Sequence, residues 1–428
     1  MIRMKRKLLL FLVAVSLGGC GSWEMGETGS LPSLAVERSD LQGRVLVPSS
    51  RFQGSPRDEA LSEVASRVRA QVSEALGNRR NPLLHDRGLD AACHRAAEAL
   101  ALGPDMDIAP TSLRTELQAE QISDVSYLPF TFHVPMGALM PESALAFILE
   151  ESRHRGITHL GVGVARSTGR RALVTLVLLR RLVSLSAFPY QVREGSRHYL
   201  WVHPASSLVN NPRVLLADPR GAVVDLPVTR EGSGVSVRVP FDQGSGRYVL
   251  QVLADNSFGT QVTNQMDVWI GEPRRGVAES PQPTGDWSGS RSSQEARMMA
   301  LLNAYRSQNG LPRLRHDDSL AATARAHSED MRDHRFFGHR SPRHGDLGSR
   351  VSTIRTSERP LVLENIAMSV SVTWAHDGLV ASPSHRRNLL DARVTHAGVG
   401  VAVREAGPIR VVYVTQHMGA LAGGGLRR

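Results

Sequence analysis

The sequence has few cysteines, few aromatic residues and almost no lysine. Its 428 residues include 5% aromatic residues and only two cysteines. Two cysteines exclude a disulfide-rich scaffold, so stability must come from packing. The formal net charge is +10, yet after Lys7 every basic side chain is an arginine. These arginines are scattered and lack the clustered stripe that phosphate backbones require, so we expect no nucleic-acid partner.

Long hydrophobic runs are also missing, and the first one is too short to span a bilayer comfortably. Arg3, Lys5, Arg6 and Lys7 precede an apolar run from Leu8 to Leu17 that ends in Gly18-Gly19-Cys20. This pattern indicates a secretory signal and resembles the lipobox of bacterial lipoproteins. The resemblance implies removal of residues 1–19, lipidation of Cys20 and attachment to the membrane through that lipid. Loss of the four leader charges lowers the net charge from +10 to +6.

The residue after Cys20 is Gly21 rather than Asp, which in Gram-negative lipoproteins permits export to the outer membrane. We therefore expect a protein of the bacterial cell envelope. Residues 20–57 are rich in Gly, Ser and acidic residues and predict a tether. Because Cys20 is committed to lipid, Cys93 is left unpaired, and its apolar helical surroundings predict a buried small hydrophobe.

The remaining chain has 41% hydrophobic and 21% charged residues, enough for two or three cores. Within residues 58–188, apolar residues recur every three or four positions from Asp58 to Leu76, which predicts a helix. A second helix is expected from Leu89 to Leu100. Leu160–Ala165 and Ala172–Leu179 read as strands. This first domain is predicted to be α/β.

Residues 189–271 change to short β-rich runs separated by turns, which predicts an Ig-like β-sandwich. Its run from Gly246 to Val252, followed by a turn at Asn256 to Gly259, is typical of a hairpin. Residues 272–293 are dense in Pro, Gly and Ser and predict a linker. Residues 294–419 then form the last domain, with helices expected from Glu295 to Gln308 and from about Ser319 to Arg332, and residues 420–428 form a tail.

The last domain contains seven short sequence motifs in a fixed order. They are Leu301-Leu302-Asn303, Gly310-Leu311-Pro312, Ala326 to Met331 (AHSEDM), Phe337 to Pro342 (FGHRSP), Glu364-Asn365-Ile366-Ala367, Ser382 to Leu390 (SPSHRRNLL) and Gly398 to Ala402 (GVGVA). In this order they resemble the bacterial SCP-like branch of the CAP superfamily, the cysteine-rich secretory, antigen five and pathogenesis-related class-one proteins. The resemblance implies an α-β-α sandwich with a tetrad of two His and two acidic residues in an open cleft that can hold a divalent metal.

Matched by motif, His339 is the first histidine of the tetrad, Glu364 the glutamate and His385 the second histidine. Asp377 is the candidate for the fourth position, although Leu379 stands where the family has a Trp. Two imidazoles and a carboxylate suit zinc or another divalent ion and leave a coordination position open. The alternative is that these residues are hydrogen-bonded cleft residues that fix loops without metal.

His327 and Ser384 are chemically reactive residue types within the same motifs, but each has a simpler structural interpretation. His327 lies beside Glu329 on a predicted helix, where a polar helix surface or a contact to the site is favoured over a ligand role. Ser384 precedes His385, and capping of a helix by Ser382 to His385 is favoured over nucleophilic catalysis.

The first domain repeats the last one faintly. Thr158 to Ala165 (THLGVGVA) corresponds to Thr395 to Ala402 (THAGVGVA), whereas the motifs that carry His339, Glu364 and His385 have no counterpart in the first copy. Residues 58–188 are therefore predicted to be a degenerate CAP-like domain that kept the core and lost the site. His159 and His396 occur in both copies and are expected to be structural.

These features predict an envelope-anchored lipoprotein whose His/Glu cleft binds an unidentified envelope or extracellular ligand, with or without a divalent metal. One alternative is a metal-assisted hydrolase of peptide, peptidoglycan or lipid ester, with Glu364 as the base. Another is a scaffold for protein contacts. The resemblance implies no established reaction, and the fold does not decide among these.

Overall fold

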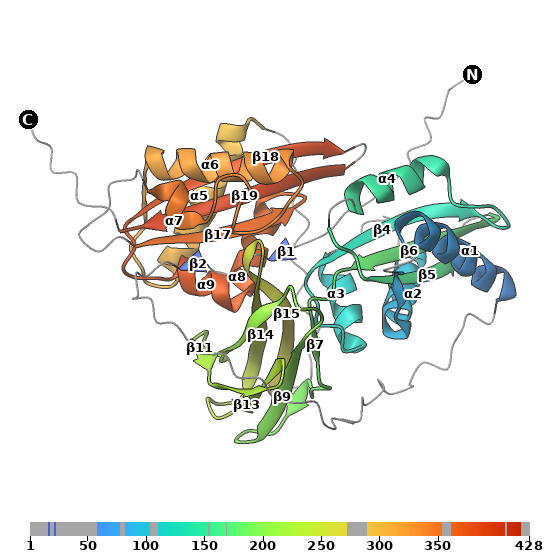
Figure 1. Ribbon diagram of the computed structural model, residues 1–428, viewed down its shortest axis with the longest axis horizontal. Helices are drawn as coiled ribbons and strands as arrows, with labels where there is room; N and C mark the ends of the chain where they lie inside the picture. Colours follow the sequence, from blue (N-terminus) through green and yellow to red (C-terminus); the bar gives the residue numbers. More distant parts are fainter. Residues whose placement is uncertain are drawn as a thin grey trace, which may run out of the picture.

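The computed structural model describes residues 16–17, 21–22, 58–77, 82–102, 110–152, 155–167, 169–271, 289–352, 361–406 and 409–420. Cys20 and nearly all of the predicted tether, linker and tail lie outside the described residues. Three domains meet at one junction, as Figure 1 shows. Within the described part of the chain, no helix combines the length and the hydropathy needed to cross a bilayer.

The N-terminal domain is a four-stranded sheet between two layers of helices. Its elements are α1 (Glu59–Leu76), β3 (Leu84–His85), α2 (Arg87–Leu102), α3 (Pro110–Ala119), β4 (Tyr127–Pro135), α4 (Glu142–Ser152), β5 (His159–Arg166) and β6 (Arg171–Leu179). The strand order is β3-β5-β6-β4, and α1 and α4 pack against one face while α2 and α3 pack against the other. The predicted helices and strands of this region are confirmed.

Residue spacing explains these helices. Leu61, Val64, Val68 and Val72 of α1 recur at three and four and are buried, and the Asp58 side chain caps the helix by accepting a hydrogen bond from the Ala60 N–H. Cys93 on α2 is fully buried, as predicted.

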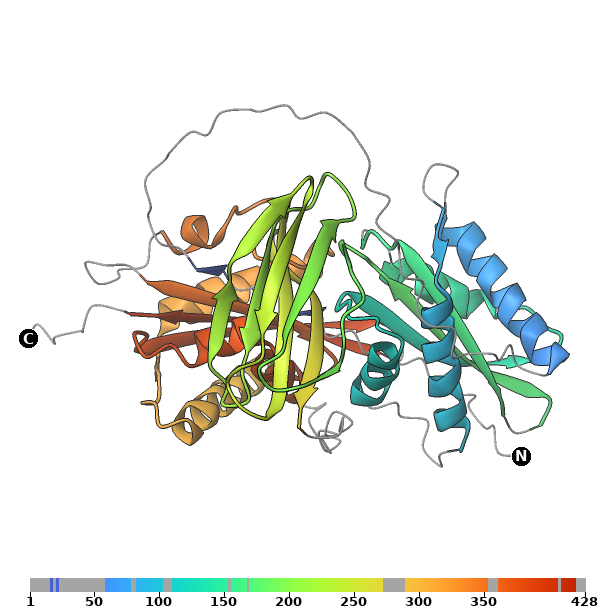
Figure 2. The same cartoon turned by 90° about the horizontal axis from the view of Figure 1, so that it is seen from below.

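The middle domain consists of two β-sheets packed face to face. Its strands are β7 (Val183–Leu185), β8 (Gln191–Val192), β9 (Arg197–Pro204), β10 (Asn210–Ala217), β11 (Val223–Leu226), β12 (Val228–Glu231), β13 (Gly234–Pro240), β14 (Gly246–Asn256) and β15 (Gly259–Ile270). The orders are β11-β10-β14-β15-β8 and β12-β13-β9-β7, with one apolar cluster between the sheets. The hairpin of β14 and β15 turns at the predicted residues and reaches the other two domains, as Figures 1 and 2 show.

The C-terminal domain is an α-β-α sandwich. Its elements are α5 (Arg291–Gln308), β16 (Arg315–His316), α6 (Asp318–Asp333), α7 (Leu347–Val351), β17 (Val362–Ser369), α8 (Val372–Ala381), α9 (Pro383–Leu389), β18 (His396–Ala406) and β19 (Ile409–Gly419). The main strand order is β17-β19-β18-β16, and short strands β1 (Ser16–Leu17) and β2 (Gly21–Ser22) run along the outer edge of β17. Helix α5 begins at Arg291 after the Ser290 cap, so it starts inside the predicted linker.

Side chains of β17 alternate between the two faces of this sheet. Leu363 and Ala367 join the apolar cluster beneath α5 and α8, whereas Ile366 and Met368 lie in the cluster that contains Met331 of α6. Gly398 and Gly400 let α6 approach β18 closely, because a Cβ at Gly400 would lie 2.1 Å from the Arg325 nitrogen.

The N- and C-terminal sheets have matching topology. In each, a two-residue strand pairs in parallel with the strand that carries the Gly-Val-Gly-Val motif, and the order of the remaining strands agrees. The threonine before each of these strands contacts the next histidine, at 2.8 Å for Thr158–His159 and 2.9 Å for Thr395–His396. These parallels support the hypothesis of a duplication and a structural role for both histidines.

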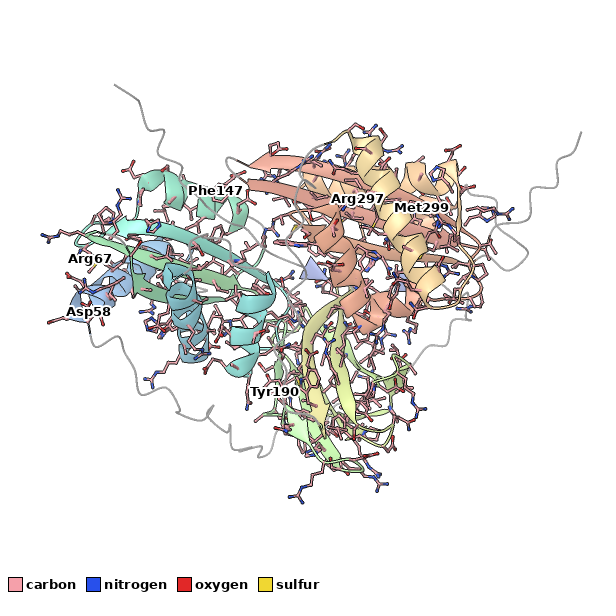
Figure 3. All side chains as sticks on the ribbon, turned by 180° about the vertical axis from the view of Figure 1, so that it is seen from behind. Asp58, Arg67, Phe147, Tyr190, Arg297 and Met299 are labelled. Carbon is pink, nitrogen blue, oxygen red and sulfur yellow. The ribbon has the colours of Figure 1, made fainter. Side chains whose placement is uncertain are left out.

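The N- and C-terminal domains share one apolar cluster, which includes Phe130 and Ile148 on one side and Ile366 and Tyr413 on the other. Glu151 at the end of α4 forms an ion pair with Arg404 of β18 across the same boundary. Figure 3 shows Phe147 of α4 on the side near the C-terminal domain, whereas Asp58 and Arg67 lie on the far side.

Candidate functional site

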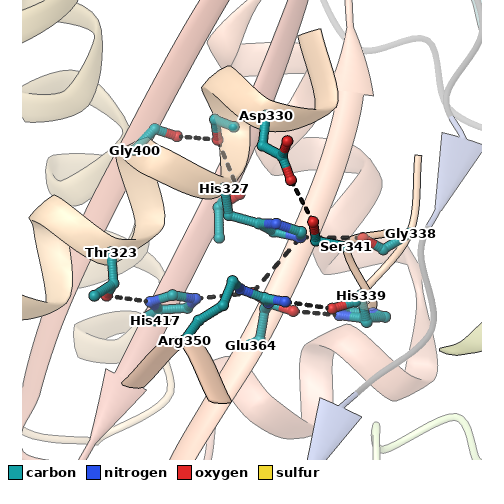
Figure 4. A network of polar contacts seen from close by, with 12 residues as sticks. Thr323, His327, Asp330, Gly338, His339, Ser341, Arg350, Glu364, Gly400 and His417 are labelled. Atoms are coloured by element: carbon teal, nitrogen blue, oxygen red, sulfur yellow. Dashed lines mark hydrogen bonds and ion pairs between the residues drawn. The ribbon is translucent and has the colours of Figure 1, made fainter. Parts of the chain in front are cut away.

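Glu364 lies at the centre of a buried polar network on the α6 face of the C-terminal sheet (Figure 4). The His339 Nδ1–H donates to its Oε1 atom over 2.7 Å, and the His417 Nε2–H donates to its Oε2 atom over 2.8 Å. The Arg350 guanidinium also binds Oε2. Three donors from three separate segments therefore engage this one carboxylate.

The network favours the ionised form of Glu364. Burial by itself raises the pKa of a carboxyl group, but the Arg350 guanidinium, together with the imidazoles around it, holds the pKa of Glu364 well below its ordinary value. His327 of α6 lies beside it, with Nε2 4.0 Å from Oε2. Burial lowers the pKa of His327 to about 4, so this imidazole is neutral at neutral pH.

Local hydrogen bonds fix the loop that carries His339. His327 donates from Nε2 to the Gly338 carbonyl over 3.0 Å, and Arg350 donates to the His339 carbonyl over 2.7 Å. The Ser341 hydroxyl donates to Asp330 of α6 over 2.5 Å. The loop is therefore held by α6 on one side and by α7 on the other.

The ionised carboxylate determines the tautomer of His339. Because a carboxylate only accepts hydrogen bonds, Nδ1 must carry the proton and Nε2 keeps a lone pair. That Nε2 atom is buried and has no hydrogen-bond partner among the described residues. His339 thus offers one unused acceptor.

His385 lies in the first turn of α9 and contacts the opposite side of β17. Its carbonyl accepts a hydrogen bond from the Asn365 side chain, and Asn365 follows Glu364 on the strand and points to the other face. No hydrogen bond or ion pair joins His385 to Glu364 among the described residues, and full burial, together with the nearby His339, lowers the pKa of His385 well below its ordinary value.

A chain of hydrogen bonds from the middle domain orients His385. The side-chain oxygen of Gln251 on β14 accepts from the Ser384 N–H over 3.0 Å, and this bond shows which end of the amide is the oxygen. The amide Nε2 then donates to the Ser382 hydroxyl over 2.8 Å. We assign the Ser382 proton to His385 Nδ1, at 2.7 Å, because it is the nearer of the two acceptors and Ser384 Oγ lies at 3.4 Å. His385 consequently carries its own proton on Nε2, which is buried and unpartnered among the described residues.

This chain corrects the predicted role of Ser382. Ser382 occupies the N-cap position of α9, but its side chain makes no capping hydrogen bond there, and Gln251 of another domain caps the Ser384 N–H instead. The Ser382 hydroxyl is directed at the imidazole. A nucleophilic Ser384 gains no support, because its hydroxyl is not the imidazole's partner.

The site residues predicted from sequence meet only in part. His339 and Glu364 are in direct contact, the His385 carbonyl binds Asn365 on the other face of β17, and Asp377 lies on α8. Sequence reasoning missed His417 and Arg350. The signal for His417 was present: it follows Tyr413 and Thr415 at a spacing of two, on the same face of a strand.

The predicted open, solvent-facing cleft is wrong for this structure. The exposed fractions are 6% for His339 and 0% for both Glu364 and His385. The reason is the β14–β15 hairpin, which packs on both histidine-bearing segments. Its Phe258 carbonyl accepts from the Arg340 N–H over 2.9 Å, and Gln265 donates to the Ala381 carbonyl over 3.2 Å.

The donor atoms do not fit a metal ion held by Glu364. Its oxygens already accept hydrogen bonds, and the Arg350 guanidinium places a positive charge where a cation would approach. In the tautomer assigned above, the lone pair of His385 lies on Nδ1 and accepts from Ser382. Across the described ranges, no three His, Cys, Asp or Glu side chains are arranged to hold a metal ion.

The N-terminal domain lacks this network at corresponding positions. His417 lies opposite Gly398 on one side and Glu364 on the other. In the N-terminal sheet, Val177 lies opposite the corresponding Gly161 and Pro129, so Val177 takes the place of His417 and Pro129 the place of Glu364. Leu320 lies against Gly398 and Leu89 against Gly161, so these two leucines correspond. His327 and Ala96 each follow their leucine by seven residues, so Ala96 takes the place of His327. Apolar side chains thus replace the polar network, which supports the hypothesis that the first copy lost the site.

Comparison with known proteins identifies the last domain independently. The model of the cysteine-rich secretory protein family, CAP, matches residues 299–418. Two curated relatives of Bacillus subtilis (strain 168), an uncharacterised membrane protein YlbC and an uncharacterised protein YkwD, are each 34% identical over 130 residues. The match covers 30% and 29% of this chain and only 37% and 48% of the two relatives, so the chain spans less than half of either.

Solved structures give weaker overall likeness. An extracellular protein containing a SCP domain from Bacillus anthracis str. Ames is 19% identical, covers 56% of this chain and 86% of its own, and has a TM-score of 0.27. A cysteine-rich secretory protein from Staphylococcus aureus Mu50 is 9% identical, with 79% and 98% coverage and a TM-score of 0.22.

Proposed function

Since residues 299–418 form a CAP domain, we propose that this chain is an extracellular binding protein that recognises a hydroxyl-bearing ligand through His339 and His385. The observation that carries this proposal is the pair of buried Nε2 atoms without partners, one a hydrogen-bond acceptor and the other a donor. A hydroxyl group donates and accepts at once, and His339 is near enough to His385 to act on its charge, so in this proposal one hydroxyl satisfies both atoms. An unsatisfied pair is costly, which provides the driving force for binding.

Glu364 serves in this proposal as a positioning residue. Its low pKa and its three hydrogen-bond donors make it a poor base, which disfavours the metal-assisted hydrolase. Its role is to orient His339 and to balance the charge of Arg350. The β14–β15 hairpin must move for a polymer to reach the two imidazoles.

We also propose that the protein is held at the outer membrane by lipid on Cys20, consistent with the lipobox resemblance. Mass spectrometry of the protein from membranes tests this: a diacylglyceryl-modified Cys20 at the N-terminus supports it. An unmodified Cys20, or a first residue elsewhere, removes it.

Binding is tested by co-sedimentation of the full chain with purified peptidoglycan sacculi, a hydroxyl-rich envelope polymer. His339→Gln together with His385→Gln should weaken binding at least tenfold. The matched control is His344→Gln with His316→Gln, two exposed histidines of the same domain, which should bind like the unaltered protein. Equal binding by both double variants, with the folds intact by circular dichroism, contradicts the proposal.

Zinc calorimetry on the same proteins tests the metal prediction directly. The donor arrangement predicts no zinc binding that depends on His339 and His385. Tight binding that only the His339/His385 variant loses would restore the metal-site prediction and overturn the hydroxyl assignment.

A further inference from the structure

We propose that a cavity at the junction of the three domains binds a single oxyanion group, such as a phosphate or a carboxylate. Each domain contributes part of its wall. The residues that line it are Val125, Ser126, Arg155 and Arg180 from the N-terminal domain, Phe258, Gln261 and Val262 from the middle domain, and Arg335, Phe336, Phe337 and Tyr413 from the C-terminal domain. It is distinct from the network around Glu364, which shares none of these residues.

The lining carries an excess of positive charge. Arg155, Arg180 and Arg335 face one cavity, and no Asp or Glu is among the lining residues. Like charges in a partly desolvated space repel each other and lose hydration, so an anion is the natural complement.

Arg180 is the least compensated of the three. Burial lowers the pKa of Arg180, and no charged partner acts on it among the described residues. Its backbone N–H donates to the Ser126 carbonyl over 2.9 Å, which fixes the start of the side chain, while the guanidinium has no hydrogen-bond acceptor within the described part of the chain. Five N–H donors thus stay available at a half-buried site.

The other two arginines are only partly engaged. Arg155 donates from Nε to the Glu151 carbonyl over 2.6 Å, and its Nη1 lies 3.6 Å from the Met368 sulfur. Arg335 forms a 3.0 Å ion pair with Glu150 and has a positive φ of 54°, a conformation that is unfavourable for arginine. The surrounding packing therefore holds Arg335 at the cavity despite a backbone cost.

The size of the cavity limits the ligand to one group. The volume of about 60 Å³ has room for a few water molecules, each of which needs roughly 10–15 Å³. A phosphate or carboxylate group fits this space, and the planar forks of arginine match the geometry of both. Phe258 and Phe336, stacked at 5.9 Å, form an apolar wall beside it.

Calorimetry on the full chain with sodium phosphate, against sodium chloride at equal ionic strength, tests the site. The unaltered protein should bind one phosphate, and Arg180→Gln should weaken binding at least tenfold. Arg170→Gln, an exposed arginine of the same domain, is the matched control and should leave the affinity unchanged. Thermal unfolding of each variant shows whether it is folded.

A second arm distinguishes a free anion from a lipid headgroup. Flotation with phosphatidylglycerol vesicles, compared with phosphatidylcholine vesicles, should depend on Arg180 if the oxyanion belongs to a lipid. The proposal is overturned if folded Arg180→Gln matches Arg170→Gln in both arms, or if the unaltered protein binds neither phosphate nor the anionic vesicles.

Discussion

At the scale of single residues, Glu364 balances the charge of the C-terminal domain's interior. Glu364→Gln removes the negative charge beside Arg350 while it keeps the shape of the side chain, so it leaves a buried guanidinium without its counter-ion. Breaking a buried ion pair in this way costs about 3–5 kcal/mol. We expect the free energy of unfolding, measured in urea, to fall by about that amount.

Two further variants make this prediction specific. Glu98→Gln changes a half-exposed glutamate of α2 and should alter the free energy of unfolding by less than about 0.5 kcal/mol. Arg350→Met combined with Glu364→Gln removes both charges and should recover part of the loss. If Glu364→Gln is as stable as Glu98→Gln, Glu364 does not balance Arg350.

At the scale of elements, the β14–β15 hairpin determines how His385 is presented. Gln251→Leu keeps the side-chain volume but removes the cap of the Ser384 N–H and the donor to Ser382. We expect a loss of about 1–3 kcal/mol in stability, the cost of leaving a buried polar group unsatisfied. We also expect the Nδ1–H tautomer of His385 to appear in long-range ¹H–¹⁵N spectra, where the unaltered protein shows Nε2–H.

Gln243→Leu is the matched control for this element. Gln243 is an exposed glutamine of the same domain, and its side chain donates only to the adjacent Asp242 in the described structure. Its substitution should leave the His385 resonances unchanged. Identical His385 spectra in the two variants would mean that the hairpin does not orient the imidazole.

The elements also show how far sequence reasoning reaches. Periodic burial predicted α1, α2, α5 and α6 closely, because each buries one face against a sheet. The motifs correctly joined His339 to Glu364. The motifs could not reveal that Arg350 and His417 bind Glu364, or that Asn365 on the other face of β17 binds the His385 carbonyl.

The contacts that sequence reasoning missed depend on tertiary structure. Arg350 lies on α7, 14 residues from Glu364, while His417 is 53 residues away and reaches it through the pairing of β17 with β19. Burial of the site depends on a different domain altogether. Neither strand register nor domain packing is encoded in the spacing of a local motif.

At the scale of the whole molecule, buried histidines should make the fold sensitive to mild acid. Burial lowers the pKa of both His327 and His376 to about 4, against an ordinary value of 6.5. Both are neutral in the folded chain, whereas the unfolded chain protonates them below pH 6.5. Their contribution to stability is therefore complete above pH 6.5 and is lost as the pH falls toward 4.

The size and origin of this acid sensitivity can be measured by urea unfolding at pH 7.5 and 5.0. One pKa unit corresponds to about 1.36 kcal/mol, so each histidine should account for about 2 kcal/mol of lost stability at pH 5.0. His376→Gln, away from Glu364, should reduce the loss by about that amount, whereas exposed His344→Gln should not. A free energy of unfolding that is equal at the two pH values would show that the folded chain accommodates charged imidazoles at these positions, contrary to their burial.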